Sequence, residues 1–180
     1  MLRKKTIFII PGHRQLPTNK AYKEIVKFLK KEGYHPIIVS LSWRNNGFLD
    51  NTEYFLKKYK KVNREKKYIL GFSFGAMVAF LASTKVDVSG LILCSLSPYF
   101  KEDLESSSLH FADLVKQIKA KQILMVYGTK EERTLIRRVR KAYADMPLEN
   151  KYLYTIKGID HTIGNKKYLQ TIHQAAKFLN

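Results

Sequence analysis

The sequence predicts an α/β fold, a three-layer αβα sandwich built around a mainly parallel six-stranded sheet. Two observations lead to this prediction: short apolar runs recur along the 180 residues, and helical patterns lie between them. Each run is continuously apolar and does not alternate with polar residues, which is typical of strands buried on both faces of a parallel sheet. Strands and helices in repeated succession imply right-handed crossovers, so helices should cover both faces of the sheet.

The expected strands are all short and rich in Ile, Val and Leu. They cover residues 6–10, 35–41, 67–72, 88–96, 121–128 and 151–156. Turn residues or charged residues separate each run from the helical pattern beside it. We therefore expect the carboxyl ends of these strands to meet at one edge of the sheet, where open α/β sheets bind their ligands.

Helices are predicted where apolar residues follow the 3.6-residue period and face away from Lys, Arg and Glu. Such faces are formed by Tyr22, Ile25, Val26 and Leu29, by Leu135, Ile136, Val139, Ala142, Tyr143 and Met146, and by Leu169, Ile172, Ala175, Ala176 and Leu179. Residues 51–61 show a weaker pattern of the same kind. Residues 74–84 are apolar almost all round, so this helix should be central and buried.

The chain is expected to form a single domain over residues 1–180, because it contains no linker, sequence repeat or low-complexity tract. One stretch interrupts the succession of strands and helices. Residues 97–120 are polar and Ser-rich at first and then helical. Because this insertion follows a strand, we expect it to form a small lid or a wall of the binding pocket.

The charge balance is strongly basic, with 33 Lys+Arg against 15 Asp+Glu and a formal net charge of +18. Such a field attracts nucleic acid and other polyanions, at least without specificity. The basic residues are spread along the whole chain and form no separate arm or tail, which favours solvated helix faces. Binding of nucleic acid or another polyanion is therefore the alternative function that the sequence offers.

The compartment is predicted from three features. Cys94 is the only cysteine, so no intrachain disulfide can form, and its apolar surroundings indicate an inert core thiol. The apolar run Ile7–Ile10 is too short for a signal peptide, whose apolar region spans about 7–15 residues. No stretch approaches the ~20 apolar residues of a membrane span. We therefore expect a cytoplasmic protein with no membrane span.

The most informative motif is Gly71-Phe72-Ser73-Phe74-Gly75, which lies between an apolar strand and an apolar helix. A sharp strand-to-helix turn lifts a serine hydroxyl clear of the backbone and points the next helix N-terminus at the reacting centre. Glycines two residues before and after the serine are needed because side chains there would collide in so tight a turn. The motif therefore predicts that Ser73 is a nucleophile.

A serine becomes nucleophilic when a base, usually a histidine held by a carboxylate, can take its proton. His161 follows the last expected strand and precedes the last expected helix, so its loop should lie at the same edge of the sheet as Ser73. His13, in the loop after the first strand, is the other histidine expected near this edge. The remaining three lie elsewhere: His35 begins a strand at the opposite end, and His110 and His173 fall within helical patterns.

The carboxylate is expected in the loop Gly128-Thr129-Lys130-Glu131-Glu132, which follows the strand 121–128. A carboxylate there can accept a hydrogen bond from the second ring nitrogen of His161 and stabilise the imidazolium. Glu131 is the first choice and Glu132 the second. Asp160 is a third option, although its position next to His161 in the sequence is a poor geometry for pairing.

Together these residues resemble the α/β-hydrolase family over nearly the whole chain, from the strand at residue 6 to the helix that ends near residue 180. The family's order of nucleophile, acid and histidine is matched by Ser73, Glu131 and His161. The resemblance implies a minimal form of the fold, with at most a small lid. It also implies that no metal or cofactor is needed.

The resemblance further implies an oxyanion hole made of two backbone N–H groups. One belongs to Phe74, the residue after the nucleophile, and the other to the loop after the first strand, where His13 is chosen over Arg14. The aromatic neighbours of Ser73 suggest an apolar acyl group. Phe72, Arg14 and Tyr99 are the residues expected to contact the substrate.

The leading prediction is a serine hydrolase of the carboxylesterase or thioesterase type. Ser73 would attack the carbonyl of a small-molecule ester or thioester, His161 would carry the proton, and water would release the acyl group. A flavodoxin-like nucleotide-binding module is disfavoured because the sequence contains no GxGxxG or Walker pattern.

Overall fold

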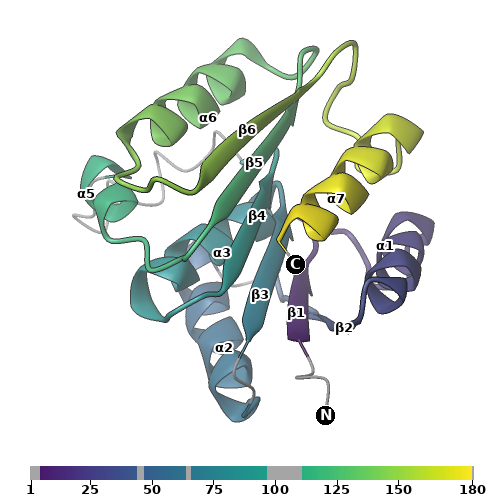
Figure 1. Ribbon diagram of the computed structural model, residues 1–180, viewed down its shortest axis with the longest axis vertical. Helices are drawn as coiled ribbons and strands as arrows, with labels where there is room; N and C mark the ends of the chain where they lie inside the picture. Colours follow the sequence, from purple (N-terminus) through teal and green to yellow (C-terminus); the bar gives the residue numbers. More distant parts are fainter. Residues whose placement is uncertain (1–4, 44–46, 64–65, 97–110, 180) are drawn as a thin grey trace.

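The computed structural model describes residues 5–43, 47–63, 66–96 and 111–179. They form one six-stranded parallel sheet with the strand order β2-β1-β3-β4-β5-β6 and helices on both faces (Figure 1). The strands are β1 (Lys5–Ile10), β2 (Tyr34–Ile38), β3 (Lys67–Phe72), β4 (Gly90–Cys94), β5 (Ile123–Gly128) and β6 (Lys151–Ile156). The predicted three-layer architecture and all six predicted strands are confirmed.

Three strands are shorter than the apolar runs suggested. β5 begins at Ile123 and not at residue 121. β2 ends at Ile38 and not at residue 41, although the N–H of Val39 still donates to the carbonyl of Ile9 at 2.8 Å. β4 covers Gly90–Cys94 and not residues 88–96. Before β4, Val88 forms only an isolated bridge with Ala120, and after it Ser95 leaves the strand with a φ of 49°. Apolar residues continue past the ends of β2 and β4, but their backbone has left the strand conformation.

The topology decides where a site can lie. From β1 the chain crosses to β2 on one side, and it then returns to β3 on the other side of β1. The strand order therefore reverses between β1 and β3, and the loops that follow these two strands diverge at the carboxyl edge of the sheet. Such a switch point is where open α/β sheets bind ligands.

Strand side chains alternate between two cores. Ile7, Ile9 and Leu70 pack with the helices α1 (Lys20–Lys31) and α7 (Lys166–Phe178) on one face. Phe8, Ile10 and Ile69 pack on the other face, which is covered by α2 (Phe48–Lys61), α3 (Phe74–Lys85), α5 (Phe111–Lys116) and α6 (Arg133–Asp145). Figure 1 shows α1 and α7 side by side, with the other helices across the sheet.

The predicted helices are found, with one different boundary. α2 begins at Phe48, before the predicted start at residue 51, because Phe48 itself is buried in the core. In α3 every residue from 75 to 84 is buried, as expected for a helix that is apolar all round. The Cys94 thiol is also fully buried, and burial raises its pKa well above the usual range, so it stays protonated and packs as an apolar group.

The segment expected to form a lid is described only in part. Residues 97–110, which include Tyr99 and His110, lie outside the described residues. In the described part, Leu114, Val115 and Ile118 are buried in the core that contains α3 and α6. The N–H of Lys119 also donates to the carbonyl of Ser83 at 2.7 Å. Residues 114–120 therefore contribute to the core, and the lid stays a prediction for residues 97–110.

Within the described part of the chain, each helix is too short or too polar to span a bilayer.

Candidate active site

The turn at Ser73 joins β3 to α3 in a strained backbone conformation. Ser73 has a φ of 55° and a ψ of −119°, a region that residues other than glycine rarely adopt. Its N–H donates to the carbonyl of Cys94 at 2.8 Å, which ties the turn to β4. The hydroxyl is thereby held at the carboxyl edge of the sheet, and only 7% of the residue's surface is exposed.

The two flanking glycines are required by close backbone contacts. A Cβ atom on Gly71 would lie 2.4 Å from the carbonyl oxygen of Gly75, on the far side of the turn. A Cβ atom on Gly75 would lie 2.1 Å from the carbonyl oxygen of Ile10. No side chain fits at either position without moving backbone, so the glycines allow α3 to start directly against the end of β1.

His161 approaches Ser73 from the loop that follows β6. Its Nε2 atom lies 2.8 Å from the Ser73 hydroxyl oxygen. The imidazole ring rests on Phe72, with ring centroids 5.1 Å apart. The backbone of this loop is held to the loop after β5, since the N–H of Lys130 donates to the carbonyl of Ile159 at 2.9 Å. These contacts fix the imidazole over the end of β3.

Of the three candidate acids, Glu131 is the one that meets His161. Its Oε2 atom lies 2.9 Å from Nδ1 of the imidazole. Its Oε1 atom accepts from the N–H of Gly128 and from the hydroxyl of Ser95, both at 2.7 Å. The Glu131 side chain is wholly buried, whereas 42% of the His161 side chain is exposed.

The other two candidate acids lie elsewhere. Glu132 is exposed at the position before α6, where its carboxylate receives a hydrogen bond from the Thr134 hydroxyl at 3.5 Å. Asp160 is exposed and precedes His161 directly in the chain. The loop sequence alone could not separate Glu131 from Glu132. The difference arises because the turn after Gly128 directs the first of the two carboxylates inward.

These contacts form one continuous line from hydroxyl to carboxylate. An ionised carboxylate can only accept hydrogen bonds, so Nδ1 carries the proton that points at Glu131. Nε2 is then unprotonated and accepts from the Ser73 hydroxyl. In this tautomer the imidazole can take the proton of Ser73 while the buried negative charge stabilises the imidazolium that forms.

The loop after β1 is held rigidly beside the turn. The N–H of Gly12 donates to Oε1 of Gln15 at 3.1 Å and to the Tyr22 hydroxyl at 3.2 Å. The Tyr22 hydroxyl donates to the same Gln15 oxygen. Because the Gly12 N–H is already engaged, the amides of His13 and Arg14 are the two that this loop offers as the second oxyanion donor.

Four aromatic rings gather next to Ser73, and we call them the aromatic face: His13, Trp43, Phe48 and Phe74. The ring of Phe74 lies 5.0 Å from His13, 5.6 Å from Trp43 and 5.0 Å from Phe48. Phe48 is buried, Trp43 and Phe74 are half-buried and His13 is exposed. Partial burial and the nearby charge of Arg14 lower the pKa of His13, so its ring is neutral at pH 7.

The residues predicted to contact the substrate differ in how exposed they are. Phe72 has no exposed surface, because it is packed between His161 and Tyr168, so it supports the imidazole from below and does not line the site. Arg14 is exposed on the loop after β1, with a φ of 57°. Tyr99 lies outside the described residues.

Sequence reasoning missed the residues that support the site from the interior. Ser95 and Tyr168 form a hydrogen-bonded group behind Glu131, and Gln15 and Tyr22 hold the loop after β1. Only Ser95 had a usable signal, since it directly follows the apolar run GLILC, as Ser73 follows its own strand. The two tyrosines were indistinguishable from other core residues of helical patterns.

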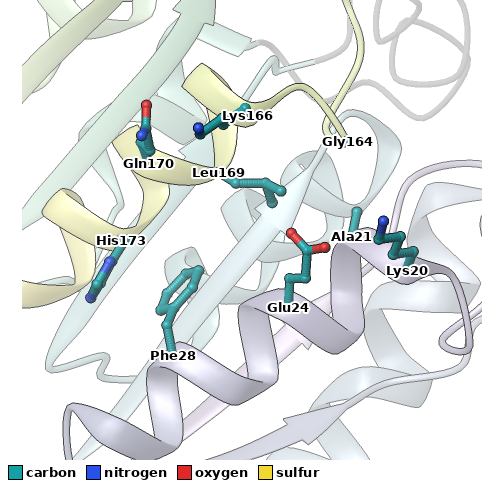
Figure 2. A pocket seen from close by; sticks show the side chains of 9 residues that line it. All are labelled: Lys20, Ala21, Glu24, Phe28, Gly164, Lys166, Leu169, Gln170 and His173. Carbon is teal, nitrogen blue, oxygen red and sulfur yellow. The ribbon is translucent and has the colours of Figure 1, made fainter.

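A separate groove of about 540 Å³ lies between α1 and α7 (Figure 2). Lys20, Glu24 and Phe28 line it from α1, and Leu169, Gln170 and His173 line it from α7. His173 joins the two helices, since it bonds Glu32 at 2.9 Å and stacks on Phe28 at 4.6 Å. None of Ser73, Glu131 and His161 lines this groove, so we assign it no part in the chemistry.

Exposed basic residues occur on helices of both faces of the sheet. They include Lys20, Lys23, Lys27, Lys30 and Lys31 on α1 and Arg133, Arg137, Arg140 and Lys141 on α6. A polyanion lying on one face of the sheet could not contact both groups. The described residues also contain no cluster of three or more His, Cys, Asp or Glu side chains that could hold a metal ion.

Comparison with known proteins adds evidence about the fold. No family model matches the sequence, and no curated protein matches it either. Solved structures do match. Est1E from Butyrivibrio proteoclasticus is 15% identical with a TM-score of 0.80, and the match covers 98% of this chain and 86% of Est1E. Est1E has also been solved with ferulic acid bound, and that structure gives a TM-score of 0.82.

Two further structures have the same architecture. Alpha/beta hydrolase domain-containing protein 10 from mouse is 13% identical with a TM-score of 0.79, over 97% of this chain and 88% of the mouse protein. An alpha-beta serine hydrolase homologue from Coxiella burnetii is 19% identical with a TM-score of 0.75, over 97% of this chain and 84% of the other. The described chain therefore has the α/β-hydrolase fold, as the sequence predicted.

Proposed function

We propose that the protein is a serine hydrolase that cleaves a carboxylic ester or thioester through an acyl-enzyme on Ser73. The observation that carries the proposal is the line of hydrogen bonds from the Ser73 hydroxyl through His161 to Glu131, at 2.8 Å and 2.9 Å. The three side chains come from loops after β3, β6 and β5, and hydroxyl, imidazole and carboxylate meet in the order that acyl transfer needs.

The reaction follows from this geometry. As the Ser73 oxygen attacks the substrate carbonyl carbon, Nε2 of His161 takes its proton, and Glu131 stabilises the imidazolium. The tetrahedral intermediate collapses, the imidazolium protonates the leaving alcohol or thiol, and the acyl group stays on Ser73. Water then enters, gives a proton to the same Nε2 atom and attacks the acyl carbon, which releases the acid and restores the hydroxyl.

The charge that develops on the carbonyl oxygen needs two donors. The Phe74 N–H is the first, since it lies at the start of α3, where the helix dipole also favours negative charge. The His13 N–H is the second, on the loop that the Gln15 and Tyr22 contacts hold beside the turn. Each such donor contributes on the order of 3 kcal/mol to the lowering of the barrier.

The aromatic face favours an apolar acyl or alcohol group. Trp43 and Phe74 are half-buried rings beside the nucleophile, and the neutral ring of His13 extends this surface. Such surfaces bind aromatic and aliphatic groups in preference to charged ones. Est1E, which shares the fold, binds ferulic acid, an aromatic carboxylic acid, and this supports the same preference here.

The proposal is tested by labelling with a fluorophosphonate probe, which reacts covalently with activated serines. We expect the wild-type protein to be labelled at Ser73 and the Ser73→Ala variant to remain unlabelled, because this variant lacks the hydroxyl that lies against Nε2 of His161. Ser42→Ala is the matched control, since Ser42 is an exposed serine in the segment after β2, and this variant should be labelled like the wild type. Labelling that persists in Ser73→Ala would refute the proposal.

The role of Glu131 is tested by removing the charge of its side chain while keeping the shape. Glu131→Gln should lower kcat for p-nitrophenyl acetate on the order of 10³–10⁴-fold, because an amide neither stabilises the imidazolium nor selects the tautomer. Glu132→Gln, the neighbouring exposed acid, should retain wild-type kcat within about twofold. Equal losses in the two variants, measured by steady-state kinetics, would contradict the assignment.

A further inference from the structure

Ser95 is a strained and fully buried residue behind the proposed triad. It follows β4 with a φ of 49°, a backbone conformation that residues other than glycine rarely adopt. Among the described residues the others with a positive φ that are not glycine are Arg14 and Ser73. All three follow strands at the carboxyl edge of the sheet. Strain of this kind persists where the surrounding structure holds a functional geometry in place.

The Ser95 side chain explains why the strain is kept. Its hydroxyl donates to Oε1 of Glu131 at 2.7 Å, the same oxygen that accepts from the Gly128 N–H. Oε2 is thereby left for Nδ1 of His161. The two donors bind one carboxylate oxygen and so decide which oxygen faces the imidazole.

Tyr168 on α7 extends this line into the core. Its hydroxyl lies 2.5 Å from that of Ser95. The single proton of Ser95 points at the carboxylate, so the Tyr168 hydroxyl is the donor in this contact. Its other acceptor, the carbonyl of Val126, is more distant at 3.4 Å. Complete burial, with Cys94 and Glu131 nearby, raises the pKa of Tyr168 well above its usual range, so it remains a donor at every working pH.

A buried carboxylate needs such donors. The Glu131 side chain has no exposed surface, and an ionised group removed from water is stable only when hydrogen bonds replace its hydration. The titratable groups that face it are His161 from the loop after β6, Tyr168 from α7 and the Cys94 thiol from β4. The tyrosine and the thiol are neutral, so the donors Ser95 and Gly128 supply the compensation.

We propose that Ser95 and Tyr168 are positioning residues, whose hydroxyl groups form a hydrogen-bonded relay that holds the Glu131 carboxylate and directs Oε2 at His161. The inference rests on the proposed function. Neither hydroxyl can touch a substrate, because both residues are fully buried. Their loss should therefore change proton transfer and leave substrate binding unchanged.

The test uses p-nitrophenyl acetate as the probe and two variants of the full chain. Ser95→Gly removes the hydroxyl and also relieves the positive φ, and Tyr168→Phe removes a hydroxyl and keeps the ring. We expect kcat to fall about tenfold in Ser95→Gly and less in Tyr168→Phe, with KM within about twofold of wild type. The acidic limb of the kcat/KM profile, which follows protonation of the imidazole, should move to higher pH in both variants, because a carboxylate oxygen that is no longer shared with other donors attracts the imidazolium proton more strongly.

Tyr34→Phe is the matched control. Tyr34 is also a buried tyrosine, and its hydroxyl donates to the carbonyl of Ala176 on α7 at 3.0 Å, so the substitution removes a bond from the same helix. This variant should unfold at lower urea concentration and keep the wild-type pH profile. An acidic limb that moves equally in Tyr34→Phe would mean that loosening α7 is the cause, and it would overturn the proposal.

The outcomes separate the two proposals. A wild-type protein that neither turns over the ester nor is labelled by a fluorophosphonate overturns both. An active wild type whose Ser95→Gly and Tyr168→Phe variants keep wild-type kcat and pH profile overturns the relay alone. Should Ser95→Gly fail to fold, Tyr168→Phe decides the question, since it leaves the core packing of the ring intact.

Discussion

Replacing His161 with Ala should lower kcat for p-nitrophenyl acetate about 10⁵–10⁶-fold. Without the imidazole, Ser73 keeps its proton and attacks only as a neutral hydroxyl, and nothing protonates the leaving group. The fold should be unaffected, because 42% of the His161 side chain is exposed and its truncation opens no cavity in the core. Steady-state kinetics with circular dichroism as a check of folding measures both parts of this prediction.

Two comparisons make the His161 result specific. His35→Ala, which changes an exposed histidine of β2, should keep wild-type kcat. The double variant Ser73→Ala with His161→Ala should be no slower than either single variant, because the two groups act as one unit. If the loss of kcat in the double variant equals the product of the two single losses, the hydroxyl and the imidazole do not share a proton.

Gly75→Ala should have the largest effect on the fold. The added Cβ would lie 2.1 Å from the Ile10 carbonyl oxygen and 2.4 Å from that of Pro11, and both obstacles are backbone atoms. To relieve the overlap, α3 must move away from the end of β1, which separates Ser73 from the loop that carries His13. We expect a loss of about 3 kcal/mol or more in the free energy of unfolding, together with loss of labelling by the fluorophosphonate.

Gly164→Ala serves as the control for this substitution. A Cβ atom there meets nothing within 4 Å, and its φ lies outside the positive region. Its stability in urea should therefore stay within about 0.5 kcal/mol of wild type. A Gly75→Ala protein as stable as this control would show that the contact between α3 and β1 is looser than the structure describes.

The succession of strands and helices was predictable because strands buried on both faces of the sheet are continuous apolar runs in the sequence. The apolar runs located β1, β3 and β6 to within one residue. They overran the ends of β2 and β4, since apolar residues such as Val39 and Leu96 remain buried after the strand has ended. Hydrophobicity indicates which residues are buried. The end of a strand depends instead on the backbone conformation, as the positive φ of Ser95 shows.

The candidate site was predictable to the extent that it follows strand ends. Ser73 and His161 could be assigned because each lies in a loop at the carboxyl edge. The choice between Glu131 and Glu132 depended on a turn after Gly128 that no sequence pattern resolves. The position of Ser95 after a strand was its only signal, and Tyr168 had none, because their contact joins residues 73 positions apart.

Under the proposed function, the distances along the chain between Ser73, Glu131 and His161 determine when the site can form during synthesis. His161 is separated from Glu131 by 30 positions and from Ser73 by 88, so these contacts are long-range and form only after most of the chain has been synthesised. A nascent polypeptide exposes its serine long before the imidazole has been translated. Under the proposed function, a nascent chain cannot cleave an ester until β6 has joined the sheet and His161 has reached Ser73.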